Sequence, residues 1–424
     1  MKKVLIRGPI LTRTGYGEQA RFAYRALKSR PDLFQVFVIP TSWGATGWTI
    51  EDTEERQEID DAITATTRHI QYSNKIGAHP FDVSIQVTIP QEWERVAPVN
   101  IGFTAGTETT HMSLKWVQAC QNVDRIIAVS EHTKAAFVNT EYTGQDENGN
   151  PASARCRAPI DVVGFPNKVL EPSPIEFETD TDFNFLSVLQ WSPRKNLENT
   201  IGWFVEEFRD NSDVGLIIKA SIARNCLVDR IHTENRLKNL KAQLGEHKCK
   251  LYLLHGNLSD EEMVSLYNQE NVHALINLAH GEGFGLPIFE AAGAGLPIIA
   301  PNWGGQNDFL HAEVTTKSKG KKKTKNRFLA AKVDYGLAQI QPEAVWTDVL
   351  IPESSWCYPR EGSYKRTLRT VYKDYARFKS QAKKLKASIE ENFSEENQNK
   401  KFVESVLAST EESRAAIASE VVTL

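Results

Sequence analysis

Strand-like and helix-like patterns alternate along most of this chain, and the alternation limits the folds that it can adopt. An apolar, β-branched run at 4–8 is followed by helical spacing at 17–30 and by a second apolar run at 34–40. Similar pairs recur over 82–140 and again over 183–278. Strands that alternate with helices indicate βαβ units and a parallel sheet. We therefore expect an α/β protein.

Length and a break in the pattern predict two domains. The chain has 424 residues, whereas single hydrophobic cores stop growing near ~250–300 residues. The segment 143–157 is rich in turn residues and predicts an exposed loop, and 161–176 holds three prolines without periodicity and predicts a linker. We expect domains at 1–169 and 170–392, with a C-terminal helix over about 393–424 packing back on the first domain.

Composition favours a soluble protein of the cytoplasm. Hydrophobic residues make up 41% and charged residues 25%, and the net charge of −4 gives no overall attraction to nucleic acid or membrane. The five cysteines form no Cys-x-x-Cys pair, which argues against a disulfide framework or a zinc site. The apolar run at the start breaks at Arg7, too early for a signal peptide, and no stretch is long enough to span a membrane.

The glycine-rich segment 280–308, "HGEGFGLPIFEAAGAGLPIIAPNWGGQND", predicts a ligand site. It follows a predicted strand at 274–278, and ligands of open α/β sheets bind at the carboxyl ends of strands. Glycine lets the backbone approach a ligand closely, and Leu286-Pro287 is typical of a helix start whose free N–H groups suit phosphate. Glu282 in the loop and Glu290 in the helix offer carboxylates to sugar hydroxyls. The combination predicts a nucleotide-sugar site.

A second segment, 315–327, carries six lysines, one arginine and no acid. We expect a solvated, mobile loop. The alternative is an anion-binding arm, centred on 317–325, for nucleic acid or lipid headgroups.

The glycine-rich segment resembles the E-x7-E signature of retaining GT-B glycosyltransferases, specifically glycosyltransferase family 4. The resemblance continues through "LLHGNLSDEEMVSLYNQENVHALINLAHGEGFG" at 253–285 and "SVLQWSPRKNLENTIGWF" at 187–204. It is looser in "VDRIIAVSEHTKAAF" at 123–137 and "TGYGEQAR" at 14–21. The resemblance implies a GT-B fold, in which two Rossmann-like, doubly wound domains face each other across a cleft. The donor then binds the second domain and the acceptor mainly the first.

The resemblance also implies roles for single residues. Arg194 and Lys195 would neutralise the donor diphosphate, which must leave with its developing charge. Glu290 would bind the ribose, and Glu282 would lie near the donor sugar. The family implies no divalent metal and no cofactor besides the donor. Further donor contacts are expected from the segment Gly283, Phe284, Gly285 and Leu286, and from Gly15 and Gly17 of the first domain.

The sequence departs from the family pattern in three places. Many members carry Gly-Arg where this chain has Gln190-Trp191, and a serine where Asn277 or His280 stands. The first-domain histidine that often contacts the donor sugar has only His111 as its candidate, with Glu108 nearby. An isolated histidine in a loop is more often an ordinary surface residue, so the acceptor-side chemistry stays open.

The resemblance favours a retaining glycosyltransferase that moves a sugar from a nucleotide-sugar donor to a hydroxyl of a glycan or a lipid-linked sugar. Three alternatives stay open. The acceptor could be a hydroxymethylated base of DNA, flipped out of its duplex. The enzyme could be a nucleotide-sugar epimerase or a glycan phosphorylase of the same fold. The protein could also bind a nucleotide sugar without turning it over.

Overall fold

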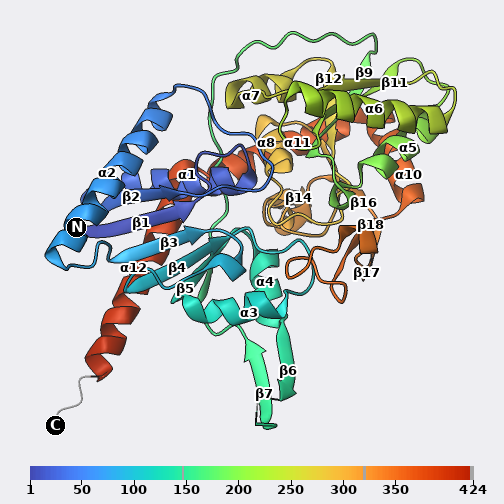
Figure 1. Ribbon diagram of the computed structural model, residues 1–424. Coiled ribbons are helices and arrows are strands. Elements are labelled where there is room, and N and C mark those ends of the chain that lie inside the picture. Colours follow the sequence, from blue (N-terminus) through green and yellow to red (C-terminus); the bar gives the residue numbers. More distant parts are fainter. Residues whose placement is uncertain (146–147, 319–320, 421–424) are drawn as a thin grey trace. The chain divides into compact units, whose positions relative to one another are not determined.

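The computed structural model describes residues 1–145, 148–318 and 321–420 (Figure 1). Contacts divide the chain into two units. Unit 1 comprises Met1–Pro166, Trp346–Ser354 and Glu395–Leu424, and unit 2 comprises Asn167–Val345 and Ser355–Ser394. The sequence predicts the segment Trp346–Ser354 as part of the second domain, whereas its contacts group it with unit 1.

Unit 1 is built on a six-stranded parallel sheet in the order β2-β1-β3-β4-β5-β8. Its strands are β1 (Lys2–Gly8), β2 (Phe34–Pro40), β3 (Val83–Val87), β4 (Val99–Thr104), β5 (Arg125–Ala128) and β8 (Ile160–Val162). The helices are α1 (Gly15–Lys28), α2 (Glu54–Ile76), α3 (Leu114–Ala119), α4 (Glu131–Asn139) and α12 (Glu395–Glu420), with short 3-10 turns η1 (Pro90–Glu92) and η2 (Cys120–Asn122).

Unit 2 repeats this plan with a six-stranded parallel sheet in the order β11-β10-β9-β12-β13-β16. Its sheet strands are β9 (Phe183–Gln190), β10 (Val214–Ser221), β11 (Lys250–Leu254), β12 (Val272–Ile276), β13 (Ile298–Pro301) and β16 (Ala331–Val333). The helices are α5 (Leu197–Phe208), α6 (Leu227–Leu244), α7 (Asp260–Asn268), α8 (Leu286–Ala294), α9 (Asn307–Leu310), α10 (Glu361–Lys373) and α11 (Tyr375–Asn392), with 3-10 turns η3 (Pro193–Lys195) and η4 (Pro342–Ala344). Each unit therefore has a Rossmann-like, doubly wound architecture, and the predicted α/β class is confirmed.

Local sequence explains where several helices begin. The side chains of Thr14 and Ser130 accept hydrogen bonds from backbone N–H groups in the first turns of α1 and α4. Ser259 and Glu262 form the capping box of α7 that their spacing predicts. Pro287 lies in the first turn of α8, as expected.

Two expected loops are hairpins instead. Most of the segment 143–157 lies in β6 (Glu141–Gln145) and β7 (Pro151–Arg155), which pair antiparallel. The lysine-rich segment belongs to β14 (His311–Ser318) and β15 (Lys321–Phe328), which also pair antiparallel. Residues 319 and 320 of that segment lie outside the described residues. The predicted linker at 161–176 also begins inside β8, a strand of the unit 1 sheet. A third hairpin joins β17 (Tyr335–Gln339) to β18 (Ser355–Pro359).

The core of unit 1 draws on chain segments that lie far apart in the sequence. Phe402 of α12 is fully buried, and its ring lies 5.4 Å from that of Phe22 in α1 and 5.2 Å from that of Phe103 in β4. Helix α12 also contacts α1 and β4, and its C-terminal part extends beyond them (Figure 1). The last described helix therefore completes a core that begins with the first.

Replacing Phe402 by alanine tests this contribution. We expect Phe402→Ala to lower the free energy of unfolding by about 3–5 kcal/mol, because a large aromatic side chain leaves a cavity in a packed core. Urea unfolding followed by circular dichroism measures the change. Glu404→Ala, an exposed position two residues further on, should stay within about 0.5 kcal/mol of the unmodified protein. Equal effects of the two substitutions would contradict the placement of Phe402 in the core.

Candidate nucleotide-sugar site

The strand order of unit 2 locates the candidate site. Strand β9 lies between β10 and β12, so the connections after β9 and after β12 leave the sheet in opposite directions along the strand order. Such a topological switch point is where open α/β sheets bind ligands, beyond the carboxyl ends of the strands. The turn η3, with Arg194 and Lys195, follows β9, and the loop with Glu282 follows β12.

Glu282 is the centre of a buried charge cluster at this point. Its carboxylate is 2.5 Å from Lys195 Nζ and 3.3 Å from Arg194 Nη1, and its side chain is only 7% exposed. Asn277 Nδ2 donates a third hydrogen bond to Oε1 at 3.1 Å. Burial alone would raise the pKa of Glu282, but Lys195 and Arg194 outweigh it and lower the pKa to about 2.

Backbone hydrogen bonds fix the segments that carry these side chains. Arg194 donates to the carbonyl of Gly281 at 2.7 Å, and the carbonyl of Arg194 accepts from the N–H of His280 at 2.8 Å. His280 in turn exchanges backbone and ring hydrogen bonds with Cys357 of β18 and stacks on Trp356. Burial and, to a smaller extent, the charge of Arg194 lower the pKa of His280, whereas the hydrogen bond to the Cys357 carbonyl raises it. The net pKa lies below the ordinary value, so the neutral ring donates a hydrogen bond to that carbonyl.

Glycines allow the loops around Glu282 to pack backbone against backbone. Gly305 donates its N–H to the carbonyl of Glu282 at 2.8 Å, and a Cβ at Gly305 would lie 1.9 Å from the carbonyl oxygen of Gly283. Gly285 has φ +95 and precedes α8 without a side-chain cap. Pro287 has no N–H group, and Ile288 and Phe289 donate theirs to the carbonyl of Gly285, so in this first turn the N–H of Leu286 is the one placed for an anionic group.

Glu290 and Phe284 have different surroundings. Glu290, in α8, is exposed, and its Oε2 accepts a hydrogen bond from Tyr267 of α7 at 3.1 Å. Burial, together with Glu290, raises the pKa of Tyr267, which therefore stays a protonated donor. Phe284 is buried, and its ring packs against Phe289 and Phe309, so only its backbone can contact a ligand. Leu286 is half-buried at the start of α8.

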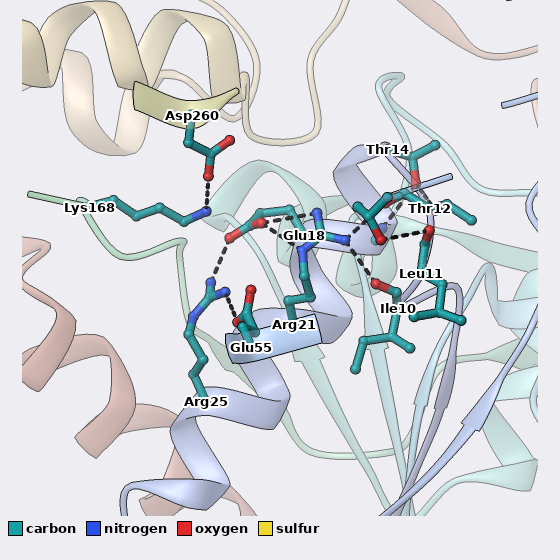
Figure 2. Close-up of polar contacts among 12 residues, drawn as sticks. Ile10, Leu11, Thr12, Thr14, Glu18, Arg21, Arg25, Glu55, Lys168 and Asp260 are labelled. Atoms are coloured by element: carbon teal, nitrogen blue, oxygen red, sulfur yellow. Dashed lines mark hydrogen bonds and ion pairs between the residues drawn. The ribbon is translucent and has the colours of Figure 1, made fainter. Parts of the chain in front are cut away.

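In unit 1, Gly17 of α1 packs closely against the loop that precedes this helix. A Cβ at Gly17 would lie 2.1 Å from the carbonyl oxygen of Thr12, so glycine is required for this packing, whereas Gly15 is exposed. Figure 2 shows the network beside it, in which Arg21 donates to the carbonyls of Ile10 and Thr12. In the same network, two carboxylates accept hydrogen bonds from Arg25, those of Glu18 and Glu55.

The candidates Glu108 and His111 lie on the loop after β4. Tyr16 of α1 hydrogen-bonds to Thr104 at 2.8 Å and stacks on Trp43 with ring centroids 4.2 Å apart. Burial first, and the nearby charge of Glu108 to a smaller extent, raises the pKa of Tyr16. His111 is exposed and its ring contacts Thr110, so it does not join this group.

The sequence does not single out three of these side chains as members of a site: Tyr16, Trp43 and Tyr267. Tyr267 is 23 positions before Glu290, and no local pattern couples the two residues. Asn277 was noted only as a departure from a serine. In the described part of the chain, no group of three or more His, Cys, Asp or Glu is placed to hold a metal ion. No helix among the described residues is long and apolar enough to cross a membrane.

Comparison with known proteins agrees with this architecture. Residues 173–335 match the family described as glycosyl transferases group 1. A serotype-specific mannosyltransferase, WbdA, from Escherichia coli is 34% identical over 118 residues, which are 27% of this chain but only 13% of that protein. The chain thus spans a small part of the length of the curated relatives that it matches.

Solved structures share the fold over the whole chain. Anabaena Alr3699/HepE in complex with UDP and glucose is 14% identical, covers 96% of this chain and 100% of its own, and has a TM-score of 0.59. Sucrose-phosphate synthase from Thermosynechococcus elongatus is 12% identical, covers 99% of this chain and 100% of its own, and has a TM-score of 0.58. At these identities the likeness shows the fold, and the fold is of the GT-B type.

The charge cluster predicts a specific response of stability to pH. The pKa of Glu282 lies below its ordinary value of 4.5 in the folded chain, so the stabilisation is complete above about pH 4.5 and is lost as the pH falls toward about 2. We expect the difference in free energy of unfolding between the unmodified protein and Glu282→Gln to shrink across that range. Urea unfolding near pH 7 and near pH 3 measures it.

Glu343→Gln, at an exposed position of unit 2, serves as the control and should show no comparable change between the two conditions. A difference for Glu282→Gln that stays constant from neutral to acid pH would contradict the ion pairing with Lys195 and Arg194.

Proposed function

We propose that the protein is a retaining glycosyltransferase that transfers a sugar from a nucleotide-sugar donor to a hydroxyl of a glycan or lipid-linked acceptor. The observation that carries the proposal is the cluster of Glu282, Lys195 and Arg194 at the switch point of unit 2. The cluster lies within the residues that match glycosyl transferases group 1. Retention rests on the resemblance of the Glu282–Glu290 spacing to the E-x7-E signature.

The donor diphosphate is the group that this cluster fits. Arg194 and Lys195 bring two cations to one point, and the N–H of Leu286 at the start of α8 adds a backbone donor. Preorganised positive charge of this kind stabilises a leaving group that departs as an anion. Glu282 holds both cations in place before the donor binds, since their positions are fixed by its carboxylate and by Gly281.

The ribose of the donor is assigned to Glu290. Its carboxylate is exposed, and Tyr267 fixes its position through one oxygen. A carboxylate can accept hydrogen bonds from two neighbouring hydroxyls. The bound UDP in the structure of HepE supports UDP-sugars as the first donors to test, and the name of the mannosyltransferase WbdA supports including nucleotide-linked mannose, such as a GDP-sugar, in the panel.

The acceptor is assigned to unit 1. The stacked rings of Tyr16 and Trp43 and the carboxylate of Glu108 are gathered near the carboxyl ends of β1, β2 and β4. Rings offer an apolar face to a sugar, and a carboxylate accepts from its hydroxyls. A hydroxymethylated base of DNA is a second candidate acceptor, and the lysine-rich hairpin is the observation that favours it.

Release of nucleoside diphosphate tests the donor site. We expect the purified protein to release the nucleoside diphosphate from one member of a panel of UDP-, GDP- and ADP-sugars. Glu290→Ala should reduce kcat/KM for that donor by about 10- to 100-fold, which is the value of a lost charged hydrogen bond. A coupled assay for the free nucleoside diphosphate gives the rates. Glu270→Ala, at another exposed glutamate of unit 2, should leave the rate unchanged.

Thermal-shift measurements of binding by the same donors distinguish two reasons for a lack of release. A donor that binds but is not cleaved indicates that the enzyme requires its acceptor, whereas a lack of binding indicates an inactive site. Absence of both release and binding across the panel would contradict the proposal. Conversion of the donor sugar into its epimer, without release of the nucleoside diphosphate, would identify an epimerase instead.

Tyr267→Phe tests whether the placement of Glu290 matters. The substitution removes only the hydroxyl that donates to Glu290, so we expect the donor Kd to rise by about 2- to 10-fold, the value of one neutral or charge-assisted hydrogen bond. Isothermal titration with the donor measures it. In a Glu290→Ala background the same substitution should add nothing, and a full additional loss there would mean that Tyr267 acts independently of Glu290.

A further inference from the structure

The hairpin formed by β14 and β15 holds the described residues of the lysine-rich segment in a fixed register. The two strands pair along their length, from His311 opposite Phe328 to Ser318 opposite Lys321. The hydroxyls of Thr315 and Thr324 lie 2.8 Å apart across the ladder, which ties the strands together near the middle. A paired strand spaces its side chains regularly, unlike a solvated loop.

Strand geometry places three described cations of β15 on a common face, whereas Lys322 points to the other face. Side chains two positions apart in a strand point the same way, so Lys323, Lys325 and Arg327 share one face over about 14 Å. All three are exposed. Residues directly opposite each other share a face, and the partners of Lys325 and Arg327 are the apolar Val314 and Ala312. We call Lys323, Lys325 and Arg327 the basic ribbon face.

The single carboxylate of the hairpin lies on the other side. Glu313 is opposite Asn326, whose side chain points away from the basic ribbon face. Among the residues that the structure describes, the basic ribbon face therefore contains three cations of the hairpin and no carboxylate of the hairpin. The contrast with the rest of the chain is large, because segment 311–328 has seven Lys and Arg against one Glu while the whole chain has a net charge of −4.

Duplex DNA is the polyanion that this shape fits best. A two-stranded ribbon fits the major groove of B-form DNA, whereas the major groove of A-form RNA is too narrow. Single strands are held by aromatic platforms, and the only ring of β15, Phe328, lies at its base against His311. Stable membrane docking needs an apolar signal beside the basic one, and none of the exposed described side chains of β15 is apolar.

We propose that the basic ribbon face binds the phosphate backbone of duplex DNA without reading its sequence. Lysine and arginine contacts to phosphates give affinity through the release of condensed counterions. Glu313, on the opposite face, does not meet the phosphates. The proposal is independent of glycosyl transfer, since the hairpin can bind DNA whether or not the site around Glu282 is active.

Fluorescence anisotropy of the full chain with a labelled, mixed-sequence duplex of about 20 base pairs tests this proposal. We expect a Kd in the range of about 10⁻⁴ to 10⁻⁶ M near physiological salt, weakening as salt rises from about 50 to 200 mM. In the triple variant Lys323→Gln, Lys325→Gln, Arg327→Gln, the slope of log K against log salt should become shallower by about 3, one unit for each lost phosphate contact.

A charge-matched control separates the hairpin from net charge. The triple variant Lys238→Gln, Lys241→Gln, Lys248→Gln changes three exposed lysines elsewhere in unit 2 and should leave the slope unchanged. Equal slopes for both variants would overturn the proposal, as would the absence of duplex binding at the lowest salt. Preference for single strands, or for vesicles containing phosphatidylserine over the duplex, would also overturn it. Circular dichroism melting of each variant establishes that it is folded.

Discussion

The ion pairs between Glu282 and the two cations of η3 are the interaction on which the candidate site depends. They join the segment after β9 to the segment after β12, so the two loops at the switch point take one arrangement. Removing one partner of a buried ion pair leaves a desolvated charge behind, which is more costly than the pair itself is stabilising. The close backbone packing of Gly305 on Gly283 and the hydrogen bonds of His280 then follow as supports for that arrangement.

Much of the fold could be predicted because its sheet strands are buried and apolar. The apolar run at 34–40 coincides with β2, and β4 and β9 lie within 82–140 and 183–278, where further pairs of strand and helix are expected. Helices α2 and α6 were missed because they bury little: α2 buries only Ile59, Thr66 and Ser73 among its residues, and α6 only Asp229 and Thr233. The sequence predicts loops at 143–157 and 315–327, where the structure has hairpins, because exposed polar strands show no hydrophobic alternation.

Site residues could be predicted only where a sequence motif singles them out. Glu282, Arg194 and Lys195 could be singled out by the resemblance, and the structure places their side chains in contact. That Glu282 would hold the cations themselves could not be seen, because the pairing joins positions almost 90 residues apart. Tyr267 was invisible for the same reason, since its partner Glu290 belongs to another helix. His111, selected by residue type alone, is exposed; its ring contacts Thr110, and its backbone exchanges hydrogen bonds with Ser354.

The return of α12 to unit 1 has a consequence for the order in which the protein is made. A ribosome releases residues 167–345 before it reaches Phe402, so unit 2 can form its sheet while the aromatic core of unit 1 still lacks one of its rings. Domains generally fold as units during synthesis, beginning with the N-terminal one. Here the aromatic core of the N-terminal unit is complete only after α12 has been made, and until then Phe22 and Phe103 lack their contact with Phe402.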